Sequence, residues 1–575
     1  MSHIFIRQRG ISKFVRQIFQ RNVQTTSFFS KDDRFCVVPS AHNLDPVVGV
    51  TIPEFFWSNL HKWGNATAFE CGVSGRKYTH DQVYKQSRSF AAALKQHGLK
   101  ENDVVAILLP NVPEYAAILL GILEAGVTAS PFNPTYTAHE IATQLNNCEA
   151  KAIVTLPMFL PQVQEAKAQC PLLKSVVVVG EAQPGCHSYF EMAKVNSDGV
   201  EFLKGSKIDT VNHTAILPWS SGTTGPPKGV MLTHSNINTN LLQVTQPGYL
   251  ATKPFTGGNE QDKFIGILPF FHIYGFLLVM AKTLYHGAHT MTLPKFEPKS
   301  FIDSVRSHQP NFLHLVPPLI SFMANSPDVK TEDLKSIACI MGGAAPIGPV
   351  IINRVLEKAG KHFLFTEGYG MTELSPVSHV SPVATNNKKI GSCGVPVPGS
   401  LCKVVDVETG EALGPNQPGE LCIKGPQLMK GYYKNEKATN ETIDAKGWLH
   451  TGDIGLYDED KYFFIVDRLK ELIKVRGFQV APSELEDLLR KHPEVTDVAV
   501  IGVPDERAGE LPRAYIVSKS SKPSEESIHK YLETKVSPNK KLKGGVEFVQ
   551  AIPKAASGKI LRRELKKDYL SKHAK

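Results

Sequence analysis

Patterns typical of buried strands and of helices alternate between residues 103 and 180. The β-branched runs at 103–111, 151–156 and 175–180 each predict a strand, and helical patterns separate them. A chain that alternates in this way forms βαβ units around a largely parallel sheet. Such sheets bind their ligands in the loops at the carboxyl ends of the strands. We therefore predict an α/β fold with its functional site in loops of this kind.

Two helix starts are marked by pairs of polar residues. Thr137 and Glu140 have the spacing of a capping box, and so do Ser483 and Glu486. In this motif the hydroxyl accepts a hydrogen bond from the backbone N–H three residues later, and the acidic side chain accepts one from the capping residue. We predict that a helix begins after the first residue of each pair.

The sequence changes in character near residue 465, where many charges begin to separate short apolar groups. The roughly 105 residues that follow are enough for an independent domain. We therefore divide the chain into a large N-terminal α/β domain of parallel-rich sheets with helices (31–466), a hinge (467–470) and a small, mobile α+β lid domain (471–575).

The net charge of +9 is confined to the two ends of the chain. Residues 1–30 carry five cations and no acid, and residues 551–575 carry a net +6, which leaves −2 for the other 520 residues. This nearly neutral body predicts no broad basic face for nucleic acid. The nine cysteines include no C-x-x-C pair, and no His/Cys cluster has zinc spacing, so we expect reduced thiols in a reducing compartment.

Residues 1–30 have the composition of a targeting segment. One apolar stripe on a helix would consist of Ile11, Phe14, Val15 and Ile18. A basic, acid-free, amphipathic start resembles a mitochondrial transit peptide. The alternative is an ordinary basic helix that lies on a membrane surface or on the protein itself. We expect a mitochondrial protein, with peroxisomal and cytoplasmic locations as alternatives; the chain does not end in the S-K-L peroxisomal signal.

The longest uncharged run, 264–281, is about 18 residues long, at the lower limit for a membrane span. It contains Pro269, His272 and Tyr274, which favour a buried strand, turn and helix. We therefore expect no transmembrane segment and at most a peripheral contact with a membrane.

The loop Ser220–Gly229, SSGTTGPPKG, has the composition of a polyphosphate cradle. Glycines let backbone N–H groups approach an anion, hydroxyls donate to phosphate oxygens, and Lys228 supplies a positive charge. The strand predicted at 214–218 puts this loop at a strand's carboxyl end. It is not the P-loop of the NTPases, because Gly229 follows Lys228 where that motif requires serine or threonine.

This loop and its continuation, SSGTTGPPKGVMLTH, resemble the signature of the adenylate-forming superfamily. That superfamily comprises acyl- and aryl-CoA synthetases, firefly luciferase and peptide-synthetase adenylation domains. Further motifs follow in the family's order: LPFFHIYGF (268–276), GGAAP (342–346), GYGMTE (368–373), GWLHTGD (447–453), VDRLKELIKVRGFQVAP (466–482) and PKAASGK (553–559). The resemblance covers about residues 45–570 and is closest to the branch of 4-coumarate-CoA ligase and luciferase.

The resemblance implies a reaction that uses ATP, Mg²⁺ and coenzyme A. A small carboxylic acid attacks the α-phosphate to give an acyl-adenylate and pyrophosphate, and a thiol then displaces AMP. Because one anion attacks another, positive charge must gather at the reacting atoms. By resemblance, Lys559 bridges the carboxylate and the α-phosphate, and Glu373 holds Mg²⁺ beside Thr372.

The resemblance also assigns the nucleotide contacts. Tyr369 would stack on adenine, Asp453 would accept hydrogen bonds from both ribose hydroxyls, and Arg468 would pair with the same nucleotide. The whole expected nucleotide set is Ser220, Ser221, Gly222, Thr223, Thr224, Gly225, Lys228, Gly343, Ala344, Glu367, Gly368, Tyr369, Gly370, Thr372, Asp453, Arg468, Lys470, Gln479 and Lys559. The expected catalytic set is Lys559, Lys228, Thr372, Glu373 and His272, with Glu373 as the metal ligand.

The pockets for the acid and for coenzyme A follow from the same resemblance. The expected acid contacts are His272, Tyr274, Phe276, Leu278, Met341, Gly343, Pro376 and Val377. The expected coenzyme A contacts are Lys295, Lys474, Arg476 and Gly477. For His272 two interpretations stay open, a gating or positioning role at this pocket and an ordinary buried histidine.

Three residues depart from the plant ligases. Glu367 replaces the usual glutamine, Arg476 replaces lysine, and Leu278 replaces a small polar residue that faces the aryl hydroxyl. An apolar pocket disfavours a hydroxylated ring, because the hydroxyl would be buried without a partner. We therefore predict an acid–CoA ligase for a medium- or long-chain fatty acid.

Other functions are compatible with the same motifs. One alternative is a 4-coumarate-CoA ligase, and another is a luciferase-like monooxygenase that acts on the adenylate. A module that loads a fused carrier is disfavoured, since only 16 residues follow Lys559. A non-catalytic binder is disfavoured too, because the four charged residues of the expected site, Lys228, Glu373, Arg468 and Lys559, are all present.

Overall fold

The computed structural model describes residues 36–220, 227–258, 260–360, 362–476, 478–505, 507–519, 524–533, 535–555 and 558–573. The predicted targeting segment 1–30 and the loop residues Ser221–Gly225 lie outside this part of the chain, and so does Gly477.

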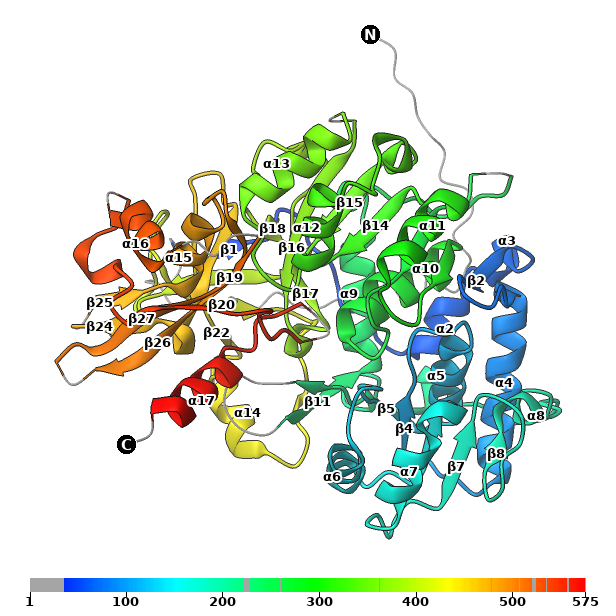
Figure 1. The fold of residues 1–575 in the computed structure, drawn as a ribbon. Helices are drawn as coiled ribbons and strands as arrows, with labels where there is room; N and C mark the ends of the chain where they lie inside the picture. Colours follow the sequence, from blue (N-terminus) through cyan, green and yellow to red (C-terminus); the bar gives the residue numbers. More distant parts are fainter. Residues whose placement is uncertain are drawn as a thin grey trace.

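Two nine-stranded sheets form the framework of the large domain (Figure 1). The first has parallel strands at its centre and antiparallel strands at the edge that carries the phosphate-cradle loop. In spatial order it contains β10 (Trp219–Ser220), β11 (Lys228–Thr233), β9 (Thr214–Ile216), β5 (Thr128–Pro131), β4 (Val104–Leu108), β6 (Ala152–Thr155), β7 (Ser175–Val178) and β8 (His187–Ser188), with β21 (Gly431–Tyr432) paired to β11. The three strands predicted between residues 103 and 180 are therefore confirmed.

The second large sheet is also parallel at its centre. In spatial order it contains β18 (Val395–Pro396), β17 (Val377–Val380), β16 (Leu364–Gly370), β15 (Cys339–Gly342), β14 (Phe312–Leu315), β12 (Lys263–Gly266), β13 (His289–Thr292), β2 (Thr67–Cys71) and β3 (Lys77–Thr79). Helices connect the parallel strands of both sheets, so the predicted α/β fold is confirmed.

Helices α4 (His80–Gln96) and α5 (Tyr115–Glu124) pack closely together in the core. Every residue of α5 is buried. A Cβ atom on Gly121 would lie only 2.7 Å from the carbonyl oxygen of Ser87, so glycine is needed for this approach. The remaining α-helices of the large domain are α2 (Ile52–Trp57), α3 (Leu60–Trp63), α6 (Ala138–Cys148), α7 (Leu160–Lys167), α8 (Tyr189–Met192), α9 (His234–Val244), α10 (Lys282–His286), α11 (Pro298–His308), α12 (Pro317–Asn325), α13 (Pro349–Lys358) and α14 (Glu436–Thr442).

The uncharged run 264–281 forms a buried strand, a turn and the start of a helix, as predicted. Its helical part includes a π-helical stretch, η4 (Gly275–Ala281), in which every residue is buried. No helix in the described part of the chain has both the length and the apolar character needed to cross a membrane.

A third sheet joins the two domains, and a fourth forms the C-terminal domain. The third is antiparallel and contains β1 (Val38–Pro39), β19 (Leu401–Val405), β20 (Gly419–Lys424), β22 (Leu449–Tyr457) and β23 (Phe463–Arg468). The fourth contains β25 (Phe478–Val480), β24 (Ile473–Val475), β27 (Gly509–Ser518), β26 (Val495–Asp505) and β28 (Val546–Phe548), with helices α15 (Pro482–Leu489), α16 (Glu525–Glu533) and α17 (Arg562–His573). The chain passes between these sheets through the short helix η8 (Leu469–Glu471). In Figure 1 the C-terminal elements, orange to red, lie at the opposite end of the molecule from α4.

One of the two predicted helix caps is confirmed and the other is wrong. Thr137 and Glu140 form the expected capping box before α6. The Ser483 hydroxyl does not cap α15; it donates to the carbonyl oxygen of Val466 at 2.6 Å. Glu486 accepts the backbone N–H of Val500 at 2.8 Å. Both side chains form hydrogen bonds with residues outside the local motif, so the capping box does not form.

Candidate functional site

The C-terminal domain places Lys559 against the large domain. The preceding Gly558 has a φ of +80°, and a Cβ atom there would lie 3.0 Å from Cδ of Pro318. A side chain would therefore be strained and would also collide with α12. The loop is closed by the Ala555 N–H, which donates to the Lys559 carbonyl oxygen at 2.8 Å.

Lys559 is surrounded by charged groups of both domains. Removal from bulk water and the Arg468 guanidinium, opposed by the Asp453, Glu373 and Glu471 carboxylates, together lower the pKa of Lys559 to about 8. With this pKa the ammonium is mostly protonated at neutral pH. The structure thus places Lys559, from the motif PKAASGK, near Asp453 of GWLHTGD and Glu373 of GYGMTE.

Asp453 is held between an aromatic hydroxyl and a guanidinium. The Tyr369 hydroxyl donates to Oδ2 of Asp453 at 2.5 Å, and Nε of Arg468 lies 3.7 Å from Oδ1. Asp453 and Arg468 face each other in the β22–β23 register. Burial raises the pKa of Asp453, and the Arg468 charge opposes that shift. Three of the residues expected at the nucleotide are therefore in contact.

Glu373 and Lys228 are connected through Tyr432. The Tyr432 hydroxyl donates to Oε1 of Glu373 at 2.8 Å, and Nζ of Lys228 lies 4.7 Å from the centroid of the Tyr432 ring. Thr372 begins the short helix η6 (Thr372–Leu374) that carries Glu373. Mg²⁺ is commonly held by one or two carboxylates together with substrate phosphates, and the buried Glu373 carboxylate fits that use.

Glu367 is a carboxyl group whose environment keeps it protonated. Its Oε2 accepts the backbone N–H of Gly391 at 2.8 Å. Burial raises the pKa of Glu367 to about 8. At neutral pH this side chain is a neutral acid, close in shape and hydrogen bonding to the glutamine that the plant ligases carry.

The backbone beside these residues is tightly packed. A Cβ atom on Gly370 would lie 2.0 Å from the Pro376 carbonyl oxygen, and one on Gly368 would lie 2.5 Å from Cε of Met341. Gly343 faces the Tyr274 ring, and the adjacent Ala344 has a φ of +70°. The glycines of GGAAP and GYGMTE therefore let β15 and β16 approach their neighbours without side chains between them.

Three apolar residues expected at the acid belong to one buried core cluster, and we call these three the apolar wall. Phe276, Leu278 and Met341 are all buried. The Tyr274 hydroxyl donates to the Met341 carbonyl oxygen at 3.2 Å, which ties the helix of this wall to β15. The backbone N–H of Val377, after Pro376, donates to Oδ1 of Asn240 at 3.0 Å.

His272 begins the same segment. Burial, with a contribution from the Lys559 charge, lowers the pKa of His272 to about 4, so the ring is neutral near pH 7. The backbone N–H of Tyr274 donates to its Nδ1 at 3.3 Å. Because the Lys559 charge contributes to this pKa shift, His272 lies near Lys559, in the same segment as Phe276 and Leu278 of the apolar wall.

The residues expected to bind coenzyme A do not contact one another through hydrogen bonds or ion pairs in the described part of the chain. Lys295 is exposed and forms an ion pair of 2.6 Å with Glu297 in the large domain. Lys474 and Arg476 are exposed on the C-terminal domain, where the Arg476 N–H donates to the Ala508 carbonyl oxygen at 2.8 Å. No hydrogen bond or ion pair within the described ranges joins Lys295 to either of them. Lys470 is exposed in η8, and the side chain of Gln479 lies outside the description.

Two residues beside the expected site were not predicted from the sequence. Tyr432 lies in no expected motif, although it contacts both Glu373 and Lys228. Arg562 lies in no expected motif either, yet it forms ion pairs with Glu471 and with Glu486. Lone aromatic and basic residues carry no sequence signal for such contacts, because their partners come from distant segments.

Comparison with known proteins agrees with this geometry. The family profile described as AMP-binding enzyme matches residues 56–433, and that of the AMP-binding enzyme C-terminal domain matches residues 484–559. The chain belongs to the AMP-binding enzymes. A 4-coumarate–CoA ligase of Arabidopsis thaliana is 38% identical to this AMP-binding enzyme over 524 residues, 90% of this chain and 92% of that protein. A probable 4-coumarate–CoA ligase of Dictyostelium discoideum is 38% identical over 90% of this chain and 94% of that protein.

Solved structures of other proteins have the same fold as this AMP-binding enzyme. The anthranilate CoA ligase AuaEII in complex with anthranoyl-AMP superimposes with a TM-score of 0.83 at 25% identity, and covers 92% of this chain and 99% of that one. ATP-bound MatB from Rhodopseudomonas palustris superimposes with a TM-score of 0.80 at 27% identity, and covers 90% of this chain and 99% of that one. With these relatives, the enzyme falls in the AMP-forming, ATP-dependent CoA ligase group that acts through an acyl-adenylate.

Proposed function

We propose that this enzyme is an acid–CoA ligase for medium- or long-chain fatty acids. The observation that carries the proposal is the buried Leu278 on the apolar wall with Phe276 and Met341. A phenolic hydroxyl that entered such a wall would lose its water without gaining a partner, which costs roughly 1–3 kcal/mol. An alkyl chain loses nothing of this kind and gains about 0.8 kcal/mol for each buried methylene.

In the proposed first step, the protein's charges align two anions. Lys559 holds the acid's carboxylate against the α-phosphate, and Lys228 neutralises charge on the polyphosphate. Tyr369 stacks on adenine while Asp453 accepts hydrogen bonds from the ribose hydroxyls. Glu373 would hold Mg²⁺, which supplies further positive charge at the phosphates when it is bound. Neutral His272 borders the acid without adding a charge.

In the proposed second step, Lys559 withdraws. Because Lys559 lies near Asp453, Glu373 and Arg468, and because no ion pair or hydrogen bond in the described ranges joins Lys295 to Arg476, this arrangement suits adenylation better than thioester formation. A rotation at residues 467–470 would remove Lys559 and carry Lys474 and Arg476 toward coenzyme A.

A 4-coumarate–CoA ligase is the second candidate. Relatives of that name are 38% identical over about nine tenths of the chain, which supports an aryl-propenoate as the acid. The two candidates differ in what they predict for Leu278. A pocket for 4-coumarate requires a polar partner for the ring hydroxyl, whereas one for an alkyl chain does not.

The test is a substrate panel for the purified protein with ATP and coenzyme A. The panel contains saturated fatty acids of medium and long chain, cinnamate and 4-coumarate. We expect kcat/KM to be highest for a fatty acid, and Leu278→Ser to improve 4-coumarate relative to cinnamate. A wild-type preference for 4-coumarate would reject the fatty-acid assignment. AMP release without coenzyme A but with oxygen would indicate a luciferase-like reaction.

We further propose a mitochondrial location from the composition of residues 1–30. Fusion of these residues to a fluorescent protein tests it, with Arg7, Arg9, Lys13, Arg16 and Arg21 changed to glutamine as the control. Loss of mitochondrial import in the control alone is the expected result. Cytosolic or peroxisomal fluorescence of the unaltered fusion would contradict the proposal.

A further inference from the structure

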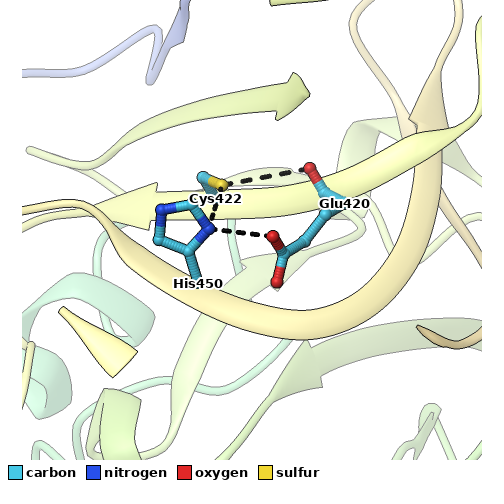
Figure 2. Close-up of side chains that lie close together, drawn as sticks. All are labelled: Glu420, Cys422 and His450. Carbon is cyan, nitrogen blue, oxygen red and sulfur yellow. Dashed lines mark hydrogen bonds and ion pairs between the residues drawn. The ribbon is translucent and has the colours of Figure 1, made fainter. Parts of the chain in front are cut away.

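Three side chains of different chemistry converge on two neighbouring inner strands of the third sheet (Figure 2). Glu420 and Cys422 belong to β20, and His450 belongs to the neighbouring β22, where it faces Cys422 in the strand register. One oxygen, the sulfur and one ring nitrogen of these residues all lie within 4.8 Å of one another. Cys422 and His450 lie 28 positions apart in the sequence. The sequence therefore contains no short spacing that would indicate a zinc site here.

The distances suit a shared metal ion. Sγ of Cys422 lies 3.5 Å from Nδ1 of His450, and Nδ1 lies 2.8 Å from Oε2 of Glu420. Zinc bonds of about 2.3 Å to sulfur and about 2.0 Å to nitrogen at a tetrahedral angle separate those two atoms by roughly 3.5 Å. The carboxylate oxygen would move away from Nδ1 by about half an ångström to reach the nitrogen–oxygen separation of such a site.

Outer contacts hold two of the three side chains in place. Oε1 of Glu420 accepts the backbone N–H of Gly452 at 2.9 Å, which leaves Oε2 directed at the cluster. Nε2 of His450 lies 3.8 Å from a carboxylate oxygen of Asp444. A carboxylate behind the second nitrogen is the usual support of a metal-binding histidine. The His450 side chain is 36% exposed, so an ion and a water ligand can enter from solvent.

We propose that Glu420, Cys422 and His450 bind a zinc ion, with water as the fourth ligand. Thiolate, imidazole and carboxylate together favour zinc over Mg²⁺ or Ca²⁺, which take oxygen ligands. On binding, the Cys422 thiol releases its proton to the solvent, and His450 binds through Nδ1 as the neutral ring.

A zinc ion here would connect β20 to β22 close to the nucleotide site. Asp453 lies on β22 only three residues beyond His450. The ion would therefore stabilise the strand that positions Asp453, without contact with substrate. This proposal does not depend on the identity of the acid.

The test uses the full-length protein, kept reduced, stripped with a chelator and titrated with Zn²⁺ against a chromophoric competitor. We expect one equivalent to bind, and Co²⁺ in its place to show a thiolate charge-transfer band. Cys422→Ser should weaken binding more than about 100-fold, since loss of outer partners alone already costs 10- to 100-fold. The matched control is Cys402→Ser, a buried cysteine on the adjacent strand β19, which should bind like the wild type.

Three outcomes would overturn the proposal. They are no bound equivalent in the wild type, unchanged zinc affinity in Cys422→Ser, and equal losses in Cys422→Ser and Cys402→Ser. Circular dichroism checks that each variant is folded. If Cys422→Ser does not fold, His450→Gln takes its place: it keeps the thiol, and we expect it to lose zinc binding. Unchanged zinc affinity in His450→Gln would equally reject the site.

Discussion

The Tyr369 hydroxyl donates a 2.5 Å hydrogen bond to Oδ2 of Asp453, and this bond joins β16 of the second large sheet to β22 of the third. The residue proposed to stack on adenine and the residue proposed to bind ribose are thus parts of one unit. The bond orients the carboxylate before the nucleotide arrives.

Tyr369→Phe should weaken nucleotide binding while keeping the stacking surface. We expect KM for ATP to rise roughly 2- to 10-fold, the value of one hydrogen bond to an oriented carboxylate, with a smaller change in kcat. Steady-state kinetics at saturating acid measure this. Tyr457→Phe, which removes a hydroxyl bonded to the Leu413 carbonyl oxygen, is the control and should leave KM unchanged. An unaltered KM in Tyr369→Phe would argue against the proposed ribose contact.

Adenylation should lose activity in alkali because Lys559 loses its proton. Its pKa is about 8 in the free enzyme, so kcat/KM for ATP should fall above that pH. Lys559→Arg should move this limb to higher pH, since arginine stays charged. Lys559→Ala should slow pyrophosphate–ATP exchange by at least about 100-fold. Lys554→Ala, which removes a lysine that pairs with Asp497, is the matched control; full activity of Lys559→Ala would refute the mechanism.

Glu367→Gln should have almost no effect on stability near pH 5 and should become increasingly stabilising as the pH rises to about 8. The pKa of Glu367 is about 8 in the fold and 4.5 as its ordinary value. Between these values the folded chain keeps a proton that the unfolded chain has released, so this residue's contribution to stability falls as pH rises. Thermal unfolding from pH about 5 to about 9 should show a growing advantage of Glu367→Gln. The exposed Glu408→Gln should show none; a constant difference in Glu367→Gln would disprove the buried neutral acid.

Lys282 should impose the opposite pH dependence on stability. Its side chain is fully buried, and Nζ lies 3.1 Å from Nε2 of His314 and 4.2 Å from the centroid of Phe312. Burial lowers the pKa of Lys282 from 10.5 to about 7. Between these values the unfolded chain binds a proton that the folded chain lacks, so stability rises with pH.

Lys282→Met should flatten that rise. The measurement is the free energy of unfolding in denaturant at neutral and alkaline pH, compared with the wild type. The substitution also changes packing at this position, but that effect is the same at both pH values. The difference in the free energy of unfolding between the two pH values therefore reports the titration of Lys282. A rise with pH that is as steep in the variant would contradict the shifted lysine.

Lys470→Pro should impair thioester formation more than adenylation. Proline restricts the backbone of η8, where the proposed rotation takes place between the two steps. Pyrophosphate–ATP exchange measures the first step, and transfer of preformed acyl-adenylate to coenzyme A measures the second. Lys470→Ala separates loss of the side chain from loss of backbone freedom. Equal losses in both steps would count against a hinge at this position.

Much of the fold could be predicted because its signals are local. The strands near residues 103–111, 151–156 and 175–180 and the cap at Thr137 each depend on a few neighbouring residues, and the structure has them where the sequence predicted them. The cap predicted at Ser483 fails because its hydroxyl finds Val466, a partner that the local motif does not contain.

The sequence by itself determined the α/β fold, the family and the motifs that carry the chemistry, because each depends on patterns of residues that are close together in the chain. The tertiary structure alone decided how those residues meet: Tyr432 between Glu373 and Lys228, and Cys422 beside His450. It also decided the charge state of Glu367, because the cost of burying a carboxylate depends on the surroundings that the fold provides.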